Sequence, residues 1–477
     1  MENNIYVTPL SGRYASLEMS RLFSNNTKYS TWRKLWVALA ETEKELGLDI
    51  TDEQINEMKA NVDNIDYEVV EKREKECRHD VMAHVYEFGT KCPKAKPIIH
   101  LGATSCYVTD NTDIIIMIQA VGLIKQTVLL EISNLKKFAD TYKDVPCLGY
   151  THFQPAQLTT VGKRATLWMQ DLLEDLQELE FVEEHLKLLG CKGTTGTSES
   201  FMKLFKDEEK VKQIDNKIAE KMGFEKTFSV SGQTYTRKVD SRVLNCLAGI
   251  AESASKFAND MRLLQHEKEL EEPFESKQIG SSAMAYKRNR IRSERINSLS
   301  WHVIALANAT NITTSTQWLE RTLDDSANKR ICVPESFLAV DGILKIYANI
   351  TQGIVVYENR IRANIMEELP FMGTEEILMN SVLKGGDRQE LHEKIRVHSM
   401  EAAKQVKELG RPNDLVTRIA EDSSFGLTKD EILAILKPEH LCGRAAHQVT
   451  DFICNDVNPV LEKYGSLIQD VDVKLEV

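Results

Sequence analysis

The most cationic segment of the chain runs from Lys287 to Arg295. It holds five cationic residues and one acidic residue, whereas the 477-residue chain carries a formal net charge of −12. The small residues at 280–283, Gly-Ser-Ser-Ala, would let a ligand approach the backbone closely, and Arg288, Arg292 and Arg295 are spaced as on one helix face. The segment suits an anion with carboxylates or phosphate. A solvated basic helix behind a surface loop is the alternative, and composition alone leaves both open.

A second polar cluster lies at 320–330, where Ser326 and Arg330 stand one helical turn apart. The two side chains could grip a phosphate, but the acids and bases around them are also spaced for i, i+4 salt bridges, which spacing alone favours. Two histidines have polar neighbours, in Arg78-His79-Asp80 and Thr151-His152. Neither pattern decides a function by itself, because a single histidine is more often structural than catalytic.

Several kinds of site are excluded by what the sequence lacks. It contains no G-x-x-x-x-G-K-[ST], no G-x-G-x-x-G and no H-E-x-x-H, and His79 and His84 are five residues apart, too far round a helix to share a metal. The negative charge argues against nucleic acid and anionic membranes as partners. The nine cysteines are odd in number and contain no C-x-x-C, which indicates reduced thiols and, with no recognisable signal peptide at the start, a cytoplasmic protein.

The elements that must position these residues are predicted to be long helices. The chain has only 23 glycines and 11 prolines, about 7% of its residues against a usual share of about 12%. Apolar residues recur every 3.6 positions from Val161 to Leu186, after the capping candidates Thr159 and Thr160. Similar spacing at 244–264, an apolar stretch after Asp113, and periodic stretches near 293–322 and 336–356 predict roughly five long helices between about 110 and 356. The longest apolar run, 114–124, is too short to span a bilayer.

We predict an all-α protein of three helical domains. They are an N-terminal domain (1–110), a central long-helix bundle that carries the loop 278–295 (111–356), and a C-terminal domain (357–477). Helices this long usually need further surface to cover them, so we expect an oligomer. A two-layer monomer is the alternative.

Residues 280–289, Gly-Ser-Ser-Ala-Met-Ala-Tyr-Lys-Arg-Asn, resemble the signature loop of the fumarase/aspartase superfamily, whose members eliminate fumarate from succinyl compounds. Other segments, in the same order along the chain, are similar to the adenylosuccinate lyase family of the animal type. These segments are 11–14 (Ser-Gly-Arg-Tyr), 78–84 (Arg-His-Asp-Val-Met-Ala-His), 100–105 (His-Leu-Gly-Ala-Thr-Ser), 151–157 (Thr-His-Phe-Gln-Pro-Ala-Gln), 192–197 (Lys-Gly-Thr-Thr-Gly-Thr) and 321–330.

The resemblance implies a homotetramer with a twenty-helix core and active sites shared by three subunits. It also implies a carbon–nitrogen lyase of purine biosynthesis, which splits adenylosuccinate into AMP and fumarate and SAICAR (the succinylamino-imidazole-carboxamide ribotide) into AICAR and fumarate. Such an elimination needs a base for the carbon-bound proton, an acid for the leaving nitrogen and donors for the dianionic carboxylate. No cofactor or metal is expected.

By family position, Ser281 is the base, His152 the acid and Glu294 the partner that orients His152. An unactivated hydroxyl is a very weak base, so backbone amides and nearby cations must stabilise its alkoxide. Lys287 and Asn289 would hold the fumaryl carboxylate, and His79 would act near the reacting nitrogen. The remaining residues expected to bind substrate are Arg13, Tyr14, Arg321, Ser326 and Arg330 (phosphate), Thr104, Ser105, Thr151 and Gln233 (succinyl side), and Arg78, Asp80 and Arg295.

Two positions depart from the superfamily loop, which commonly has proline where this chain has Ala285 and Arg290. Losing two φ constraints should widen the open-loop ensemble without removing a reacting group. Two other functions remain as alternatives: another fumarate-releasing lyase such as argininosuccinate lyase, and a catalytically silent member with a structural or binding role.

Overall fold

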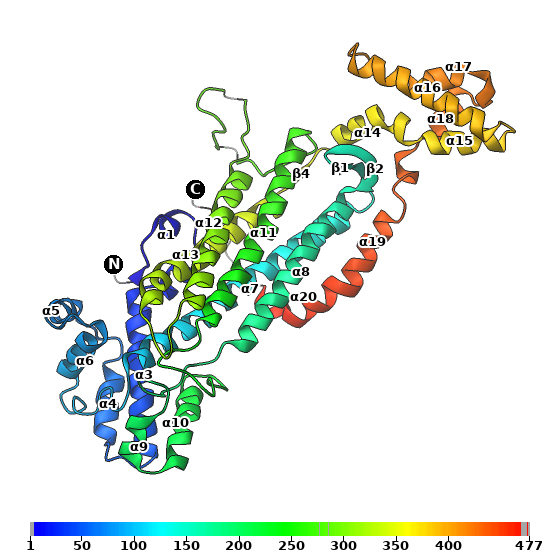
Figure 1. Cartoon of the computed structure of the whole chain (residues 1–477). Helices are drawn as coiled ribbons and strands as arrows, with labels where there is room; N and C mark the ends of the chain where they lie inside the picture. Colours follow the sequence, from blue (N-terminus) through cyan, green and yellow to red (C-terminus); the bar gives the residue numbers. More distant parts are fainter. Residues whose placement is uncertain (1–3, 276, 285, 469–474, 476–477) are drawn as a thin grey trace.

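The computed structural model describes residues 4–275, 277–284, 286–468 and 475, and its fold is all-α, as predicted. Five long helices run side by side through its centre (Figure 1). They are α7 (Ser105–Thr141), α8 (Val161–His185), α11 (Lys238–His266), α12 (Ile291–Ser315) and α13 (Asp324–Thr351).

Ion pairs and hydrogen bonds between these helices give their directions. Asp113 of α7 binds Lys329 of α13 at 2.7 Å near the starts of both helices, and Asn134 binds Thr351 at 3.3 Å near their far ends. The same pair of helices is therefore parallel, whereas α12 is antiparallel to α11, since Ser241 early in α11 binds Asn311 late in α12 at 2.7 Å. We call the end where α7, α11 and α13 begin the lower end, and the opposite end the upper end.

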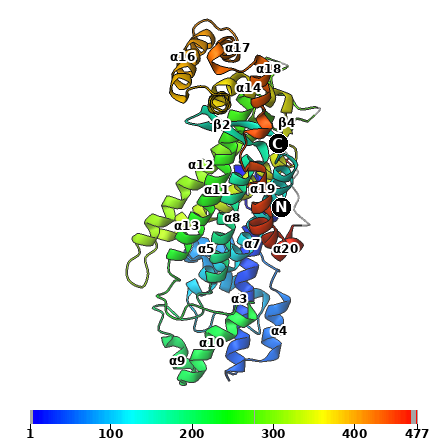
Figure 2. The same cartoon turned by 90° about the vertical axis from the view of Figure 1, so that its right-hand side faces the viewer.

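Some helices outside the bundle extend the molecule beyond both ends, and others lie along its sides (Figure 1 and Figure 2). Those before it are α1 (Pro9–Arg13), α2 (Leu17–Leu22), α3 (Asn25–Glu45), α4 (Asp52–Ala60), α5 (Tyr67–Cys77) and α6 (Asp80–Lys91). Below the lower end lie α9 (Glu199–Phe205) and α10 (Glu208–Lys221).

After the bundle come α14 (Glu358–Met372), α15 (Thr374–Leu383), α16 (Arg388–Lys407), α17 (Leu415–Glu421) and α18 (Lys429–Ile435), followed by α19 (Ala445–Phe452) and α20 (Asn458–Tyr464). Short 3-10 turns are η2 (Ser423–Phe425), η3 (Pro438–His440) and η5 (Gly465–Leu467), and η4 (Ile453–Val457) is a π-helical turn. The division into three domains stays a prediction.

The predicted start of α8 is confirmed, since the Thr160 hydroxyl accepts the amide of Lys163 at 3.1 Å and caps the helix. The start of α7 was predicted too late: the helix begins at Ser105, not near Asp113. Its polar first turns are held by contacts that apolar spacing does not reveal, such as the Asn111 amide, which donates to the carbonyls of Tyr107 (2.7 Å) and Gly190 (2.9 Å).

The ends of α12 and α13 also differ from prediction. α12 stops at Ser315, not near 322, and α13 begins at Asp324, not 336. Two aspartates in its first turn suit a helix N-terminus, and Pro334 lies inside the helix. Pro334 has no N–H to donate to the carbonyl of Arg330. Arg330 is exposed, so water can donate to that carbonyl instead.

Two small sheets, which we did not predict, lie at the upper end. Strands β1 (Pro146–Thr151) and β2 (Gln154–Thr160) form an antiparallel hairpin whose register shifts between Leu148 and Tyr150. A Cβ on Gly149 at this shift would lie 2.6 Å from the carbonyl oxygen of Gln157, so the bulge needs glycine. The second sheet pairs β3 (Leu270–Glu271) with β4 (Val355–Val356).

Aromatic side chains join three of the long helices in the core. Trp168 of α8 packs edge-on against Phe257 of α11 with centroids 5.1 Å apart, and Phe257 stacks on Tyr347 of α13 at 4.1 Å. α7 is long and apolar enough to cross a membrane by length and composition, with a mean hydropathy of 1.7 in its most apolar window, but 61% of that window is buried inside the protein. This is the burial of a core helix.

Candidate active site

At the lower end, predicted site residues occupy the starts of helices. His79 caps α6, because its Nδ1 accepts the amide of Met82 at 3.3 Å. The neutral ring then carries its proton on Nε2, which lies 3.4 Å from the Ser105 hydroxyl at the start of α7. Thr104 precedes Ser105, and its hydroxyl lies 3.5 Å from the Gln233 amide nitrogen. Thr104 makes no side-chain cap hydrogen bond to the described start of α7, and the positive end of that helix dipole makes this a favourable place for an anion.

Arg330 joins the same group from α13. Its guanidinium donates to Asp80 Oδ2 at 3.1 Å, across 250 positions of sequence. Ser326 lies one turn before Arg330 near the start of α13. Arg78 stands just before His79, in a left-handed conformation (φ 56°) that ends α5. The chain thus brings together His79, Asp80, Thr104, Ser105, Gln233 and Arg330.

His84, from the same sequence motif, has a different place. Its ring stacks on Tyr29 with centroids 3.9 Å apart and meets Trp32 edge-on. Burial, aided by the positive charge of Arg33, lowers the pKa of His84 to about 3, so it is a neutral core residue. Among the residues that the structure describes, no group of three or more His, Cys, Asp or Glu side chains could hold a metal ion.

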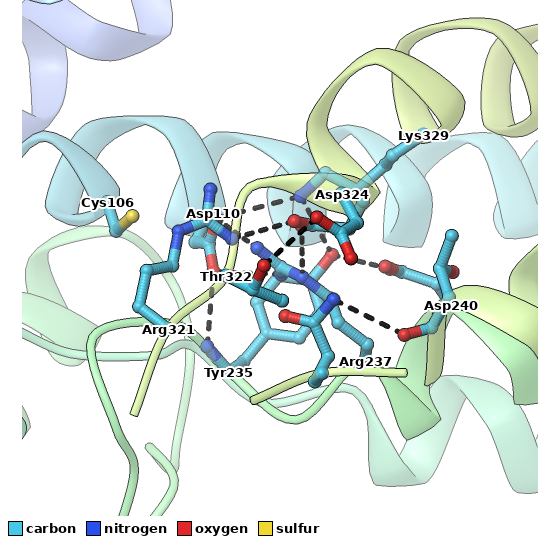
Figure 3. Close-up of polar contacts among 12 residues, drawn as sticks. Cys106, Asp110, Tyr235, Arg237, Asp240, Arg321, Thr322, Asp324 and Lys329 are labelled. Carbon is cyan, nitrogen blue, oxygen red and sulfur yellow. Dashed lines mark hydrogen bonds and ion pairs between the residues drawn. The ribbon is translucent and has the colours of Figure 1, made fainter. Parts of the chain in front are cut away.

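Beneath this group lies a buried ion-pair network (Figure 3). Arg237, the N-cap residue of α11, binds both carboxylate oxygens of Asp110, at 2.9 and 3.2 Å. Its Nε also donates to Asp325 at 2.6 Å. Burial alone would lower the pKa of Arg237 and raise that of Asp110, but the attraction between the two charges outweighs burial and shifts each pKa the other way. Both groups are therefore charged, and they tie the starts of α7, α11 and α13 together.

At the upper end, the loop 278–290 presents Ser281. The hydroxyl of Ser281 accepts the backbone amides of Ala283 (3.3 Å) and Met284 (3.1 Å). Two N–H groups aimed at one oxygen would stabilise an alkoxide. The loop closes on itself: the Asn289 amide donates to the carbonyl of Gly280 at 2.5 Å, and a Cβ on Gly280 would lie 2.1 Å from the carbonyl oxygen of Lys287.

The cations of this loop do not all serve one purpose. Arg292 is buried and binds Glu275 at 3.2 Å, and Arg288 binds Glu271 at 3.3 Å. The expectation that Arg288, Arg292 and Arg295 share one helix face is corrected, because α12 begins only at Ile291. Lys287 is exposed on the loop. Ala285, one of the two replaced prolines, lies outside the described residues.

His152 stands at the tip of the hairpin. It and Phe153 form the two-residue turn between the paired residues Thr151 and Gln154, and both have positive φ (54° and 56°). This is the pattern of a type I′ turn, which usually takes Asn or Gly. Two bulky residues with positive φ are strained there, and the imidazole is exposed; strain of this kind clusters at functional sites.

Other predicted residues lie apart from these groups. In the part of the chain that the structure describes, no hydrogen bond or ion pair joins His152 to Glu294. Glu294 is exposed in the first turn of α12. Arg13 and Tyr14 line a surface cavity with Lys345, and Tyr14 packs on Gly342. Gly342 lies about 24 Å along α13 from Ser326, so one chain does not bring the predicted phosphate residues together. Arg295 lies on α12 at the upper end.

The two groups of candidate residues lie at opposite ends of the bundle. At 1.5 Å per residue, the 37 residues of α7 span about 55 Å, with Ser105 at the lower end and the hairpin of His152 beyond the upper end (Figure 1). A single copy of the chain cannot bring His79 and His152 to one substrate.

Sequence reasoning missed Arg237 and Asp110 completely. They are 127 positions apart and neither lies in a recognisable pattern, so only the fold reveals the pair. Asp325 and Lys329 lie in the polar cluster 320–330, for which the sequence favoured salt bridges. That alternative is partly confirmed, since Arg321 binds Asp325 at 2.8 Å.

The sequence matches two described protein families, "Lyase" over residues 16–305 and "Adenylosuccinate lyase C-terminus" over residues 370–452. It is 51% identical to adenylosuccinate lyase of Saccharomyces cerevisiae over 476 residues, covering 99% of each chain. The corresponding enzyme of Schizosaccharomyces pombe is 49% identical, covering 99% of each chain, and that of Schistosoma mansoni is 47% identical, covering 96% of each.

Solved structures share the fold at lower identity. The 3-carboxy-cis,cis-muconate lactonizing enzyme of Pseudomonas putida superimposes with a TM-score of 0.80 at 20% identity, covering 93% of this chain and 97% of that one. A fumarate lyase of Mesorhizobium sp. BNC1 gives 0.79 at 20% identity, covering 94% and 100%. Together with the matches along nearly the whole sequence, the helical bundle and its signature loop confirm the resemblance: the chain belongs to the adenylosuccinate lyase family.

Proposed function

We propose that this chain is a carbon–nitrogen lyase that eliminates fumarate from adenylosuccinate, leaving AMP, and from SAICAR, leaving AICAR. The observation that carries the proposal is the Ser281 hydroxyl facing two backbone amides in the signature loop. Its support is family membership at about half identity over the whole chain.

In this reaction Ser281, as the alkoxide, takes the proton from the carbon next to the carboxylate of the succinyl group. The electron pair left on that carbon delocalises into the carboxylate, and the resulting dianion needs cationic and N–H donors, which Lys287 and Asn289 supply. Collapse of the dianion forms the double bond of fumarate and breaks the C–N bond. His152, as the general acid, gives its proton to the departing nitrogen.

The lower-end group would hold the rest of the substrate. Arg330, Arg321 and Ser326 offer donors to a phosphate near the start of α13, and the helix N-terminus adds its partial positive charge. Thr104, Ser105 and Gln233 offer donors at the start of α7, and His79 sits beside them. Neutral and charged donors of this kind suit the several anionic groups of a succinyl nucleotide.

We further propose that complete active sites form only between copies of the chain, in a homotetramer. The support is that the two groups of residues lie at opposite ends of α7, a helix about 55 Å long. Large apolar side chains also lie exposed at and beyond α12, where another copy could cover them. They are Trp301 (64% exposed), Ile312 (61%), Trp318 (73%), Leu319 (97%) and Leu323 (70%).

We also propose that the protein works in the cytoplasm. Its nine cysteines are all unpaired, and several are buried, as expected of a protein from a reducing compartment. Fractionation of cells that express a tagged chain would test this.

The decisive experiment is to incubate the purified protein with adenylosuccinate and follow AMP and fumarate. Wild-type protein should turn over, and Ser281→Ala and His152→Ala should each lose at least about a hundredfold in kcat. His392→Ala, on the exposed face of α16, is the matched control and should retain wild-type rates. Absence of turnover by wild type would favour a catalytically silent member, and undiminished rates in the two site variants would contradict the assigned roles.

A further inference from the structure

The carboxylate of Asp325 is shared by two arginines. Its Oδ1 accepts from Arg321 at 2.8 Å, and its Oδ2 accepts from Arg237 at 2.6 Å. The side chain of Asp325 is only 1% exposed and that of Arg237 only 2%, whereas that of Arg321 is 21% exposed. Of the three charged groups, only Arg321 therefore reaches the surface.

Arg237 is itself fixed from several directions (Figure 3). Two of its nitrogens bind Asp110 of α7, its guanidinium lies over the Tyr235 ring at 4.5 Å, and its carbonyl accepts the hydroxyl of Thr314 at 2.8 Å. With both its guanidinium and its backbone held, Arg237 fixes Oδ2 of Asp325. The second oxygen of that carboxylate is then presented to Arg321 in one orientation.

The contact between Arg321 and Asp325 is not a pair within one helix, although the residues are four apart. α13 begins at Asp324, so Arg321 lies in the loop 316–323 before it. The place of its guanidinium therefore depends on Asp325 and not on a helix of its own. A guanidinium has five N–H donors, and the bond to Asp325 uses one of them.

We propose that Asp325 is a positioning residue for substrate phosphate: anchored by Arg237, it aims the remaining N–H groups of Arg321 at the phosphate of the nucleotide. This inference rests on the proposed function, which places a phosphate beside Arg321. It adds residues that touch no substrate, and it makes the phosphate site depend on the buried pair Arg237 and Asp110.

The direction in which Asp325→Asn changes the affinity for AMP distinguishes positioning from simple electrostatics. Asp325→Asn removes a negative charge close to the phosphate site, so the loss of Coulomb repulsion alone would make AMP bind more tightly. If Asp325 positions Arg321, the variant should bind AMP more weakly, because the neutral amide holds two guanidinium groups less firmly. A structural role would lower the melting temperature without a selective change in affinity.

The test compares Asp325→Asn with Asp414→Asn, which breaks another Asp–Arg contact four residues apart, to Arg418 at 2.8 Å. We expect Asp325→Asn to raise the Kd for AMP, measured by calorimetry, and the KM for adenylosuccinate by about tenfold, with kcat within about twofold of wild type. Asp414→Asn should change none of these values. Arg237→Lys keeps the charge but loses the fork of donors, and should weaken AMP binding in the same direction.

Unchanged or tighter AMP binding in folded Asp325→Asn would overturn the proposal, and so would an equal loss in Asp414→Asn. If Asp325→Asn does not fold, the AMP affinity of Arg237→Lys decides, with unchanged affinity counting against positioning. Failure of the wild type to split adenylosuccinate would overturn the proposed function alone, because AMP binding is measured without turnover.

Discussion

Two inactive variants with substitutions at opposite ends of the bundle should restore activity when they assemble together. His79→Ala alters the lower end and His152→Ala the upper end, about 55 Å of helix apart. If every site takes its lower-end group from one copy and its hairpin from another, a site is whole only when both contributors carry the intact residue. In random equimolar assemblies each of the two contributors carries the intact residue with a probability of about one half. About one quarter of the sites are then complete, so activity should recover to about one quarter of wild type.

The assay is coexpression of the two variants with different affinity tags, purification through both tags, and measurement of adenylosuccinate turnover. Each variant alone should remain at or below about 1% of wild type. His152→Ala loses the general acid, which costs at least about a hundredfold, and His79→Ala loses a side chain that by family position acts near the reacting nitrogen. Recovery to about one quarter therefore stands well above background.

A second mixture of variants, in which no complete site can form, serves as the control. Arg330 binds Asp80 within one chain at 3.1 Å, so His79→Ala and Arg330→Ala both alter the same lower-end group. In their mixed oligomers every copy has a damaged lower-end group, and no recovery is expected. Background activity in the first mixture, or equal recovery in both mixtures, would refute the reasoning.

Three further substitutions test other parts of the structure. Both carboxylate oxygens of Glu43 are buried without a partner in the described part of the chain, and burial raises its pKa from 4.5 to about 8. The stability that comes with the protonated form is present below about pH 4.5 and is lost as the pH rises towards 8. The unfolding free energy of wild type should therefore fall between about pH 5 and 8. In Glu43→Met this fall should be less steep, by up to about 1.4 kcal/mol per pH unit. Denaturant titrations at several pH values measure this, and parallel curves for variant and wild type would contradict it. Gly280→Ala places a Cβ 2.1 Å from the carbonyl oxygen of Lys287 and should lower kcat at least tenfold. The melting temperature should change little, since the loop is largely exposed. An unchanged kcat would show that the loop conformation does not matter for catalysis. Ala285→Pro should raise kcat or lower KM slightly if loop closure limits the rate, and steady-state kinetics identical to wild type would count against that idea.

Sequence reasoning succeeded where the information is local. The 3.6-residue spacing after Val161 and the capping hydroxyl of Thr160 predict α8 to within one residue at its end. Where a helix is held by buried polar contacts with distant segments, as at Asn111 in α7, the apolar pattern begins too late. The hairpin of His152 was missed because its turn residues, His and Phe, are not the residues that usually signal such a turn.

The sequence by itself determined that the chain forms long helices, which residue types could perform an elimination, and which family it resembles, because periodicity and ordered motifs are properties of the linear chain. Only the tertiary structure decided how those residues are grouped. Asp80 meets Arg330, and Arg237 meets Asp110 and Asp325, through contacts between helix ends that are far apart in sequence. The rigid length of α7 keeps His152 at the other end. That separation is set by helix geometry, and it supports the proposal that a complete site forms between copies of the chain.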